Sequence, residues 1–212
     1  MIDTSESANL GATVPWAVLL PRNMGNRGQN TLSVPETFRR LRLASSTVSF
    51  IAYHPRPSGN FVFEGADALA IEQAVSIGER AIGLRCLARS FDDLTRVDRS
   101  VPPTAEVVRN SVVLQTPPRV MRVVFVALSE GVDVRRRVLG PLRKRIDVLS
   151  WPSDRDVLCL YERRGESGDV GNVTRALEGR LRAITKRAEL VGTGRAMMVI
   201  RDILSGRRLK TD

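Results

Sequence analysis

Two polar segments in the first half of the chain carry residue types that bind anions. One follows a short apolar run at 14–20, and the other is the turn from His54 to Asn60. Arginine presents paired donors to phosphate and carboxylate groups, and glycine permits close backbone approach. The predicted ligand-binding residues are Arg22, Asn23, Asn26, Arg27, Asn30, Arg56, Ser58, Gly59 and Asn60. The alternative is that both segments are solvated loops, with asparagine and glycine serving turn geometry.

Catalytic and metal chemistry find little support in the sequence. His54 is the only histidine, and without a nearby carboxylate in the sequence to orient it we expect an exposed ring or a local hydrogen bond. Cys86 and Cys159 lie in apolar surroundings and are expected to be buried and unpaired, since no Cys-x-x-Cys pair exists to hold zinc. Neither a phosphate-binding loop nor a dinucleotide fingerprint is present. We therefore predict no catalytic residue, no metal and no cofactor.

The charge balance is strongly basic. The chain has 33 Lys and Arg residues against 23 Asp and Glu, a net charge of +10. Such an excess favours polyanion partners, although arginine-rich codon usage or solvated helix faces would also produce it. The predicted nucleic-acid contacts are Arg135, Arg136, Arg137, Arg143, Lys144 and Arg145. Aromatic residues are only 5% of the chain, and segment 58–64 lacks the stacking aromatics of an RNA-recognition motif.

Hydrophobic periodicity predicts the same order of elements in both halves. The expected strands of the first half are 14–20, 47–53, 60–64 and 84–88, with helices beginning after Ser33 and Asp67 and a further short helix at 91–97. In the second half we expect strands at 119–129, 146–151, 157–161 and 186–191, helices at 133–139 and 172–184, and a terminal helix at 193–204. Gly140 and Pro141 should end or kink the helix at 133–139. The sequence therefore predicts an α+β fold of two tandem ferredoxin-like (β-α-β-β-α-β) subdomains with antiparallel sheets, plus a C-terminal helix.

The same patterns predict the domain boundaries. These are a disordered tail at 1–12, a first subdomain at 13–98, a connector at 99–118, a second subdomain with the terminal helix at 119–206, and a flexible tail at 207–212. No apolar run approaches the roughly 20 residues of a membrane span, and the first residues do not resemble a secretory signal. We therefore expect a cytoplasmic protein.

The predicted topology brings the two polar segments together. In a β-α-β-β-α-β unit the loop after the first strand and the turn between the second and third strands lie at the same end of the sheet, on neighbouring strands. Arg22 to Asn30 would then face Arg56 to Asn60 and form one anion site.

Several segments resemble one bacterial family. The chain is similar to the family catalogued as domain of unknown function 1697, and the most specific match is Ser58-Gly-Asn-Phe-Val-Phe63. The other similar segments are Ala17–Leu20, Asn30–Val34 and, near the end, Asp156–Tyr161 and Thr193–Arg195. The chain departs from the family pattern at Pro21–Arg22, Gly171–Thr174 and Ala196–Met198. The resemblance implies a two-subdomain ferredoxin-like fold and implies no established reaction.

Three functional hypotheses follow from these observations. The first is a non-enzymatic binding protein that recognises an anionic ligand or partner through the two polar segments. The second is an enzyme that acts at the same place on a small phosphorylated or carboxylated metabolite. The third is a nucleic-acid binder that uses the basic second half. Residue patterns leave the physiological ligand and the oligomeric state open.

Overall fold

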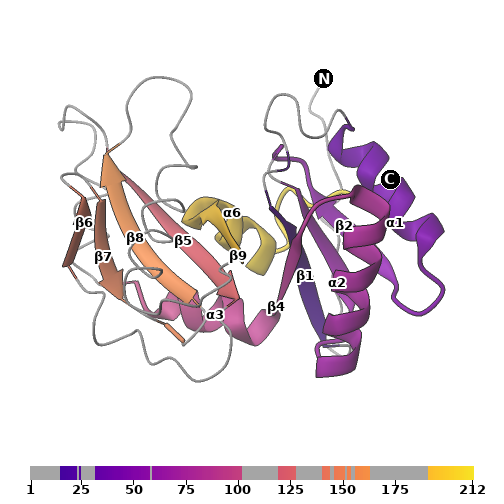
Figure 1. Cartoon of the computed structure of the whole chain (residues 1–212), viewed down its shortest axis with the longest axis horizontal. Helices are drawn as coiled ribbons and strands as arrows, with labels where there is room; N and C mark the ends of the chain where they lie inside the picture. Colours follow the sequence, from indigo (N-terminus) through magenta and orange to yellow (C-terminus); the bar gives the residue numbers. More distant parts are fainter. Residues whose placement is uncertain are drawn as a thin grey trace. The chain divides into compact units, whose positions relative to one another are not determined.

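The structure is a computed structural model of the whole chain (Figure 1). It describes residues 15–22, 24, 32–57, 59–101, 119–127, 140–143, 146–150, 152–153, 156–162 and 191–212. Within these residues the protein is a mixed α/β fold with a four-stranded sheet, a five-stranded sheet and four helices. The chain divides into two compact units. The first comprises Met1–Thr95 together with Met198–Asp212, and the second comprises Arg96–Met197.

The first unit follows the strand and helix order predicted for the first half. Its elements are β1 (Trp16–Pro21), α1 (Val34–Ala44), β2 (Phe50–His54), β3 (Asn60–Glu64), α2 (Ala68–Ile82) and β4 (Cys86–Ser90), followed by α3 (Phe91–Arg99). The sheet has the order β2-β3-β1-β4, and every neighbouring pair is antiparallel. Predicted strand limits differ from the observed ones by up to three residues, because pairing with neighbours decides where a strand begins.

Side chains close in the sequence cap the starts of the two long helices. The Ser33 side chain accepts a hydrogen bond from the Glu36 backbone N–H at 3.3 Å, and the Asp67 side chain accepts one from Ala70 at 2.8 Å. Both residues stand just before the predicted helix starts, and their side chains stabilise these starts because the first turn of a helix leaves backbone donors without intrahelical partners. The Glu36 carboxylate pairs with Arg39 at 2.7 Å.

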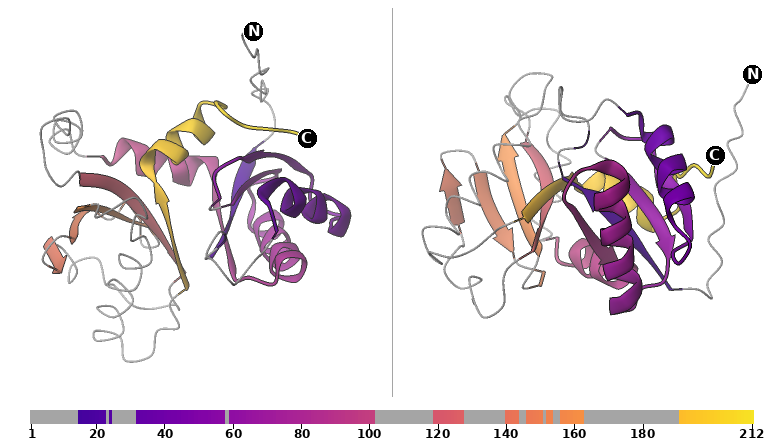
Figure 2. Two further views of the ribbon diagram at one scale, coloured as in Figure 1. Left: turned by 90° about the horizontal axis from the view of Figure 1, so that it is seen from above. Right: turned by 45° about the vertical axis from the view of Figure 1, so that its right-hand side comes forward.

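One face of the first sheet is covered by α1 and α2 (Figure 2). The core on this face is apolar and fully or almost fully buried. Its main residues are Ala17, Leu19, Phe38, Leu41, Phe50, Tyr53, Phe61, Phe63, Ala74 and Ile77. Because side chains alternate along a strand, the intervening residues point to the opposite face. These are also buried, and they include the polar residues His54, Asn60 and Arg89.

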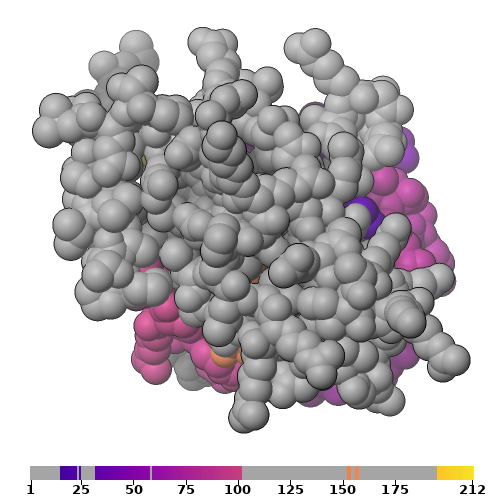
Figure 3. All heavy atoms as spheres, turned by 60° about the vertical axis from the view of Figure 1, so that its left-hand side comes forward, coloured from indigo at the N-terminus to yellow at the C-terminus, as the bar shows by residue number. Residues whose placement is uncertain are grey.

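The third helix of the first half is amphipathic. Leu94 and Val97 are buried, whereas Asp92, Arg96 and Arg99 are exposed. Part of α3 is visible on the surface in Figure 3, in pink. The helix therefore shields apolar side chains and presents charged ones to solvent.

The C-terminal residues return to the first unit, contrary to the predicted boundaries. A helix was expected to begin at 193, but residues 191–196 form a strand and helix α6 (Met197–Leu204) begins after it. Residues Met198–Asp212 belong to the first unit rather than to the second. The predicted flexible tail at 207–212 is wrong: Leu209 is buried, and Lys210 exchanges backbone hydrogen bonds of 2.8 and 2.9 Å with Tyr53. The reason is that β2 is an edge strand, whose outer backbone groups can pair with another segment.

The second unit contains a five-stranded antiparallel sheet. Its strands are β5 (Arg119–Ala127), β6 (Gly140–Arg143), β7 (Ile146–Ser150), β8 (Asp156–Glu162) and β9 (Val191–Ala196), in the order β6-β7-β8-β5-β9. Gly140 and Pro141, expected to break a helix, lie in the edge strand β6, a position that tolerates proline. The strand predicted at 186–191 begins instead at Val191. The helices predicted at 133–139 and 172–184, the tail at 1–12 and most of the connector lie outside the described residues.

Candidate functional site

The first sheet brings the end of β1 beside the starts of β3 and β4. Leu19 pairs with Phe61, and Pro21 pairs with Cys86. Beyond the strand, the Arg22 backbone N–H donates to the Arg85 carbonyl at 2.8 Å. These antiparallel registers put the exit of β1 and the β2–β3 turn at the same end of the sheet, as the predicted topology requires.

Met24 lies directly against the β2–β3 turn. Gly59 has a φ of +63°, and a Cβ added there would collide with the Met24 sulfur. Glycine is therefore needed at this position for two reasons, its left-handed backbone and the close approach of Met24. The described part of the loop after β1 contacts the turn that carries Arg56.

The structure describes four of the nine predicted ligand-binding residues. Arg56 is exposed, Arg22 is half-buried, Gly59 lies beneath Met24, and Asn60 is fully buried within the sheet. The other five, Asn23, Asn26, Arg27, Asn30 and Ser58, lie outside the described residues. Asn60 pairs in register with His54, so its side chain belongs to the interior. The two arginines are the described members that solvent can reach.

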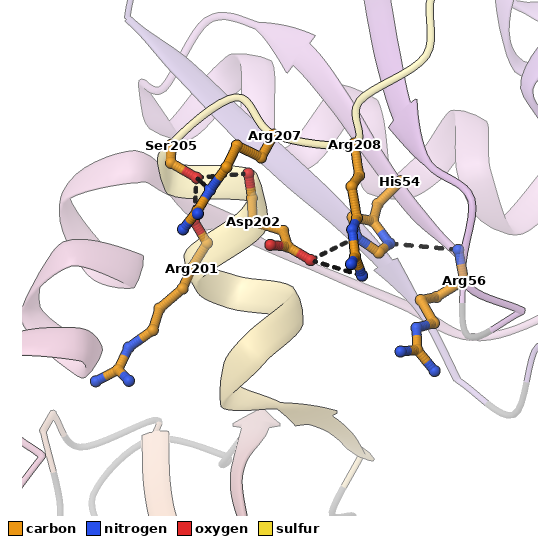
Figure 4. A network of polar contacts seen from close by, with 7 residues as sticks. All are labelled: His54, Arg56, Arg201, Asp202, Ser205, Arg207 and Arg208. Carbon is orange, nitrogen blue, oxygen red and sulfur yellow. Dashed lines mark hydrogen bonds and ion pairs between the residues drawn. The ribbon is translucent and has the colours of Figure 1, made fainter. Parts of the chain in front are cut away.

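His54 differs most from its sequence-based prediction. Its side chain is only 1% exposed, and its Nε2 lies 3.4 Å from Oδ2 of Asp202 on α6 (Figure 4). The expectation of an exposed ring was wrong, because α6 reaches this end of the sheet. The expected local hydrogen bond is present, since Nδ1 accepts the Arg56 backbone N–H at 3.3 Å. Asp202 was missed because it lies 148 residues further along the chain.

The hydrogen bonds of His54 define its tautomer. A backbone N–H can only donate, so Nδ1 must be unprotonated, and the hydrogen resides on Nε2 and is donated to Asp202. Burial lowers the pKa of His54, and this is the largest effect on it. The hydrogen bond and the charge of Asp202 raise the pKa by less, and the charges of Arg56 and Arg208 lower it further. The imidazole is therefore neutral at neutral pH, and both of its nitrogens are engaged.

Arg208 adds a positive charge to this end of the sheet, and it is not among the predicted site residues. Its Nη1 lies 3.7 Å from Asp202 Oδ2, and its side chain is 60% exposed (Figure 4). The residue has a φ of +59°, unusual for a side chain other than glycine. Next to it, Arg207 Nε donates to Ser205 Oγ at 3.0 Å. For Asp202 the sequence does contain a weak signal of burial, because this acid lies between the apolar residues Ile200 and Ile203.

The remaining predictions concern the second unit and metal chemistry. Arg143 lies in β6, whereas Arg135, Arg136, Arg137, Lys144 and Arg145 lie outside the described residues. Cys86 is buried and forms no disulfide within the described part of the chain. The part of the chain that the structure describes holds no group of three or more His, Cys, Asp or Glu residues suited to a metal ion. In the same part, no helix is long and apolar enough to cross a membrane.

Comparison with solved structures gives distant likenesses, among them a microcompartment protein and a proposed chlorite dismutase. No protein-family model matches the chain, and no curated protein matches it. A microcompartment protein from Desulfitobacterium hafniense is 12% identical over 84% of this chain and 93% of its own, with a TM-score of 0.27. A proposed chlorite dismutase is 14% identical over 91% of this chain and 99% of its own, with a TM-score of 0.26. At TM-scores of this size neither likeness carries a conclusion about fold or function.

Proposed function

We propose that the first unit is a binding module for an anionic group, a phosphate or a carboxylate, at the end of the sheet where β1 leaves and β2 turns into β3. The observation that supports this most is the contact of Met24 with Gly59, which holds Met24, two residues after Arg22, against the turn that carries Arg56. Guanidinium groups suit such anions because their donors match the spacing of two oxygens. Ligand recognition of this kind requires no catalytic group.

The enzyme hypothesis is less well supported by the same geometry. A general base needs a ring nitrogen that can reach a substrate proton. In His54, Nδ1 accepts from Arg56 and Nε2 donates to Asp202. The histidine and carboxylate that would have formed a catalytic pair therefore serve to join α6 to the sheet.

We also propose that the second unit repeats the ferredoxin-like plan of the first and that the chain is a divergent member of the domain of unknown function 1697 family. What supports the repeat is the strand order. Without the edge strand β6, the second sheet reads β7-β8-β5-β9, which corresponds strand for strand to β2-β3-β1-β4 in the first. The family proposal depends on the motif around Ser58–Phe63.

The nucleic-acid hypothesis depends on charge alone. Its test is the salt dependence of binding to arbitrary single-stranded and duplex nucleic acid, because affinity from phosphate contacts falls steeply as salt increases. Absence of binding at low salt would eliminate it.

The anion-binding proposal is tested by a pair of double variants with the same change in charge. Arg22→Ala with Arg56→Ala removes two arginines at the proposed site, and Arg39→Ala with Arg40→Ala removes two from α1. We expect inorganic phosphate, pyrophosphate or citrate to raise the melting temperature of the wild-type and of the α1 variant through mass action, but not that of the site variant. Equal stabilisation of all three proteins would contradict the proposal, since it would show binding through overall charge.

A further inference from the structure

The C-terminal segment, residues 205–212, is fastened to the outer edge of the first sheet. Lys210 pairs with Tyr53 through two backbone hydrogen bonds, and the side chain of Leu209 is buried. Tyr53 immediately precedes His54, whose ring is bonded to Asp202 at the last turn of α6. These contacts hold Arg208, which lies between the end of α6 and the paired Lys210, beside the turn that carries Arg56.

The guanidinium of Arg208 is held by charge more than by hydrogen bonding. Its Nη1 is 3.7 Å from Asp202 Oδ2, longer than the 2.7–3.2 Å of an ordinary N–H to oxygen hydrogen bond. Asp202 Oδ2 also receives the Nε2 hydrogen of His54 at 3.4 Å. The Asp202 side chain is only 11% exposed, whereas that of Arg208 is 60% exposed. A group arriving from solvent therefore reaches Arg208 before it reaches the carboxylate.

The charged side chains near His54 have a net positive charge, which attracts an anionic group from solvent. Arg56 and Arg208 both lie close enough to His54 to lower its pKa, and Asp202 is the carboxylate that acts in the opposite direction. Two guanidiniums against one carboxylate favour an added anion. A phosphate group suits two guanidiniums better than a single carboxylate does, because it has more terminal oxygens and carries a larger charge at neutral pH.

We propose that Arg208 is a ligand-binding residue of the anion site, and that a phosphate group binds by taking its guanidinium from Asp202. The proposal builds on the anion-binding function above and adds the C-terminal segment to that site. In this scheme Asp202 has two roles. It fastens α6 to His54, and it competes with the ligand for Arg208.

Three single variants test this proposal by calorimetric titration with inorganic phosphate and pyrophosphate. Arg208→Gly removes the guanidinium without backbone strain, because glycine adopts a positive φ readily. We expect its affinity to be about tenfold weaker, the usual size for a hydrogen bond to a charged group. Arg207→Ala removes the same charge one residue earlier and should change affinity by less than about twofold.

Asp202→Asn gives the most decisive result. Asparagine keeps an oxygen that can accept from His54 Nε2, but it no longer attracts Arg208 by charge. We expect phosphate to bind several-fold more tightly, whereas a purely structural Asp202 would give unchanged or weaker binding. Circular dichroism and thermal melting confirm that each variant is folded before it is titrated.

The outcomes separate this proposal from the one on which it depends. Loss of binding in the Arg22 and Arg56 double variant, with Arg208→Gly binding as tightly as the wild-type, overturns the role of Arg208 and leaves the anion site intact. Unchanged binding in that double variant overturns the anion site itself. Tighter binding of citrate than of phosphate by the wild-type would contradict the phosphate preference, and no binding of phosphate by the wild-type would contradict both proposals.

Discussion

The two faces of the first sheet are buried in different ways. The face under α1 and α2 contains large apolar side chains, among them Leu19, Phe38 and Phe61, which are completely buried. The opposite face contains Val18 and Val62 but also the buried polar residues His54, Asn60 and Arg89. Apolar burial is non-directional and tolerates many partners, whereas a buried polar group needs a partner in a defined position.

This difference assigns the two faces different roles. The helix-covered face stabilises the fold chiefly through apolar burial, because its large side chains leave water entirely. The opposite face, which we call the polar face after its buried residues His54, Asn60 and Arg89, selects one arrangement of remote segments. The Nε2 of His54 has its partner only when Asp202 of α6 is in place. The segment that carries Arg208 follows α6 directly, so the polar face also positions the proposed ligand-binding residue.

The largest effect is expected from a cavity on the apolar face. Phe61 is fully buried, and its ring stacks on that of Phe38 with centroids 6.5 Å apart. Phe61→Ala should lower the free energy of unfolding by about 3–5 kcal/mol. Urea denaturation measures this through the fluorescence of Trp16 in a Trp151→Phe background.

The control for that variant is a leucine on the surface of the same unit. Leu43 on α1 is 87% exposed, and Leu43→Ala should change the free energy of unfolding by no more than about 0.5 kcal/mol. If Phe61→Ala were no more harmful than the control, apolar burial on the helix-covered face would not stabilise the first unit.

A smaller effect is expected on the polar face. His54→Ala removes the donor to Asp202 and should cost about 1–3 kcal/mol, because the carboxylate remains largely buried. Asp202→Ala should cost a similar amount, and the double variant should cost less than the sum by about 1 kcal/mol. Urea denaturation of the four proteins gives this coupling, and strictly additive losses would show that the two side chains do not interact.

The smallest effect is a pH dependence specific to the polar face. Burial lowers the pKa of His54 below its usual 6.5, against the raising effect of Asp202 and together with the charges of Arg56 and Arg208. The stabilisation from neutral His54 is therefore complete above about pH 6.5 and is lost as the pH falls towards the lower pKa of the folded protein. Because His54 is the only histidine, an NMR titration of its ring between about pH 5 and 8 reports this group alone. A midpoint above 6.5 would show that Asp202, rather than burial, dominates.

Much of the first unit was predictable because its signals are local. Ser33 and Asp67 each bond a backbone N–H three residues away, so a short window of sequence contains the whole interaction. Short apolar runs likewise identified β1 and β3. That the exit of β1 and the β2–β3 turn share one end of the sheet was an inference from topology, and the described registers agree with it. That Arg22 and Arg56 form one anion site stays a prediction.

The partners of His54 and Arg208 could not be predicted in the same way. An aspartate 148 residues away has no fixed relation to a histidine until the chain folds. Polar residues at 207–212 resemble a solvated tail, since nothing local reveals that an edge strand will pair with Lys210. Composition, caps and periodicity thus determined the elements of the first unit. Only the tertiary structure decided which remote groups fill its polar face, because long-range pairing depends on geometry that no short segment contains.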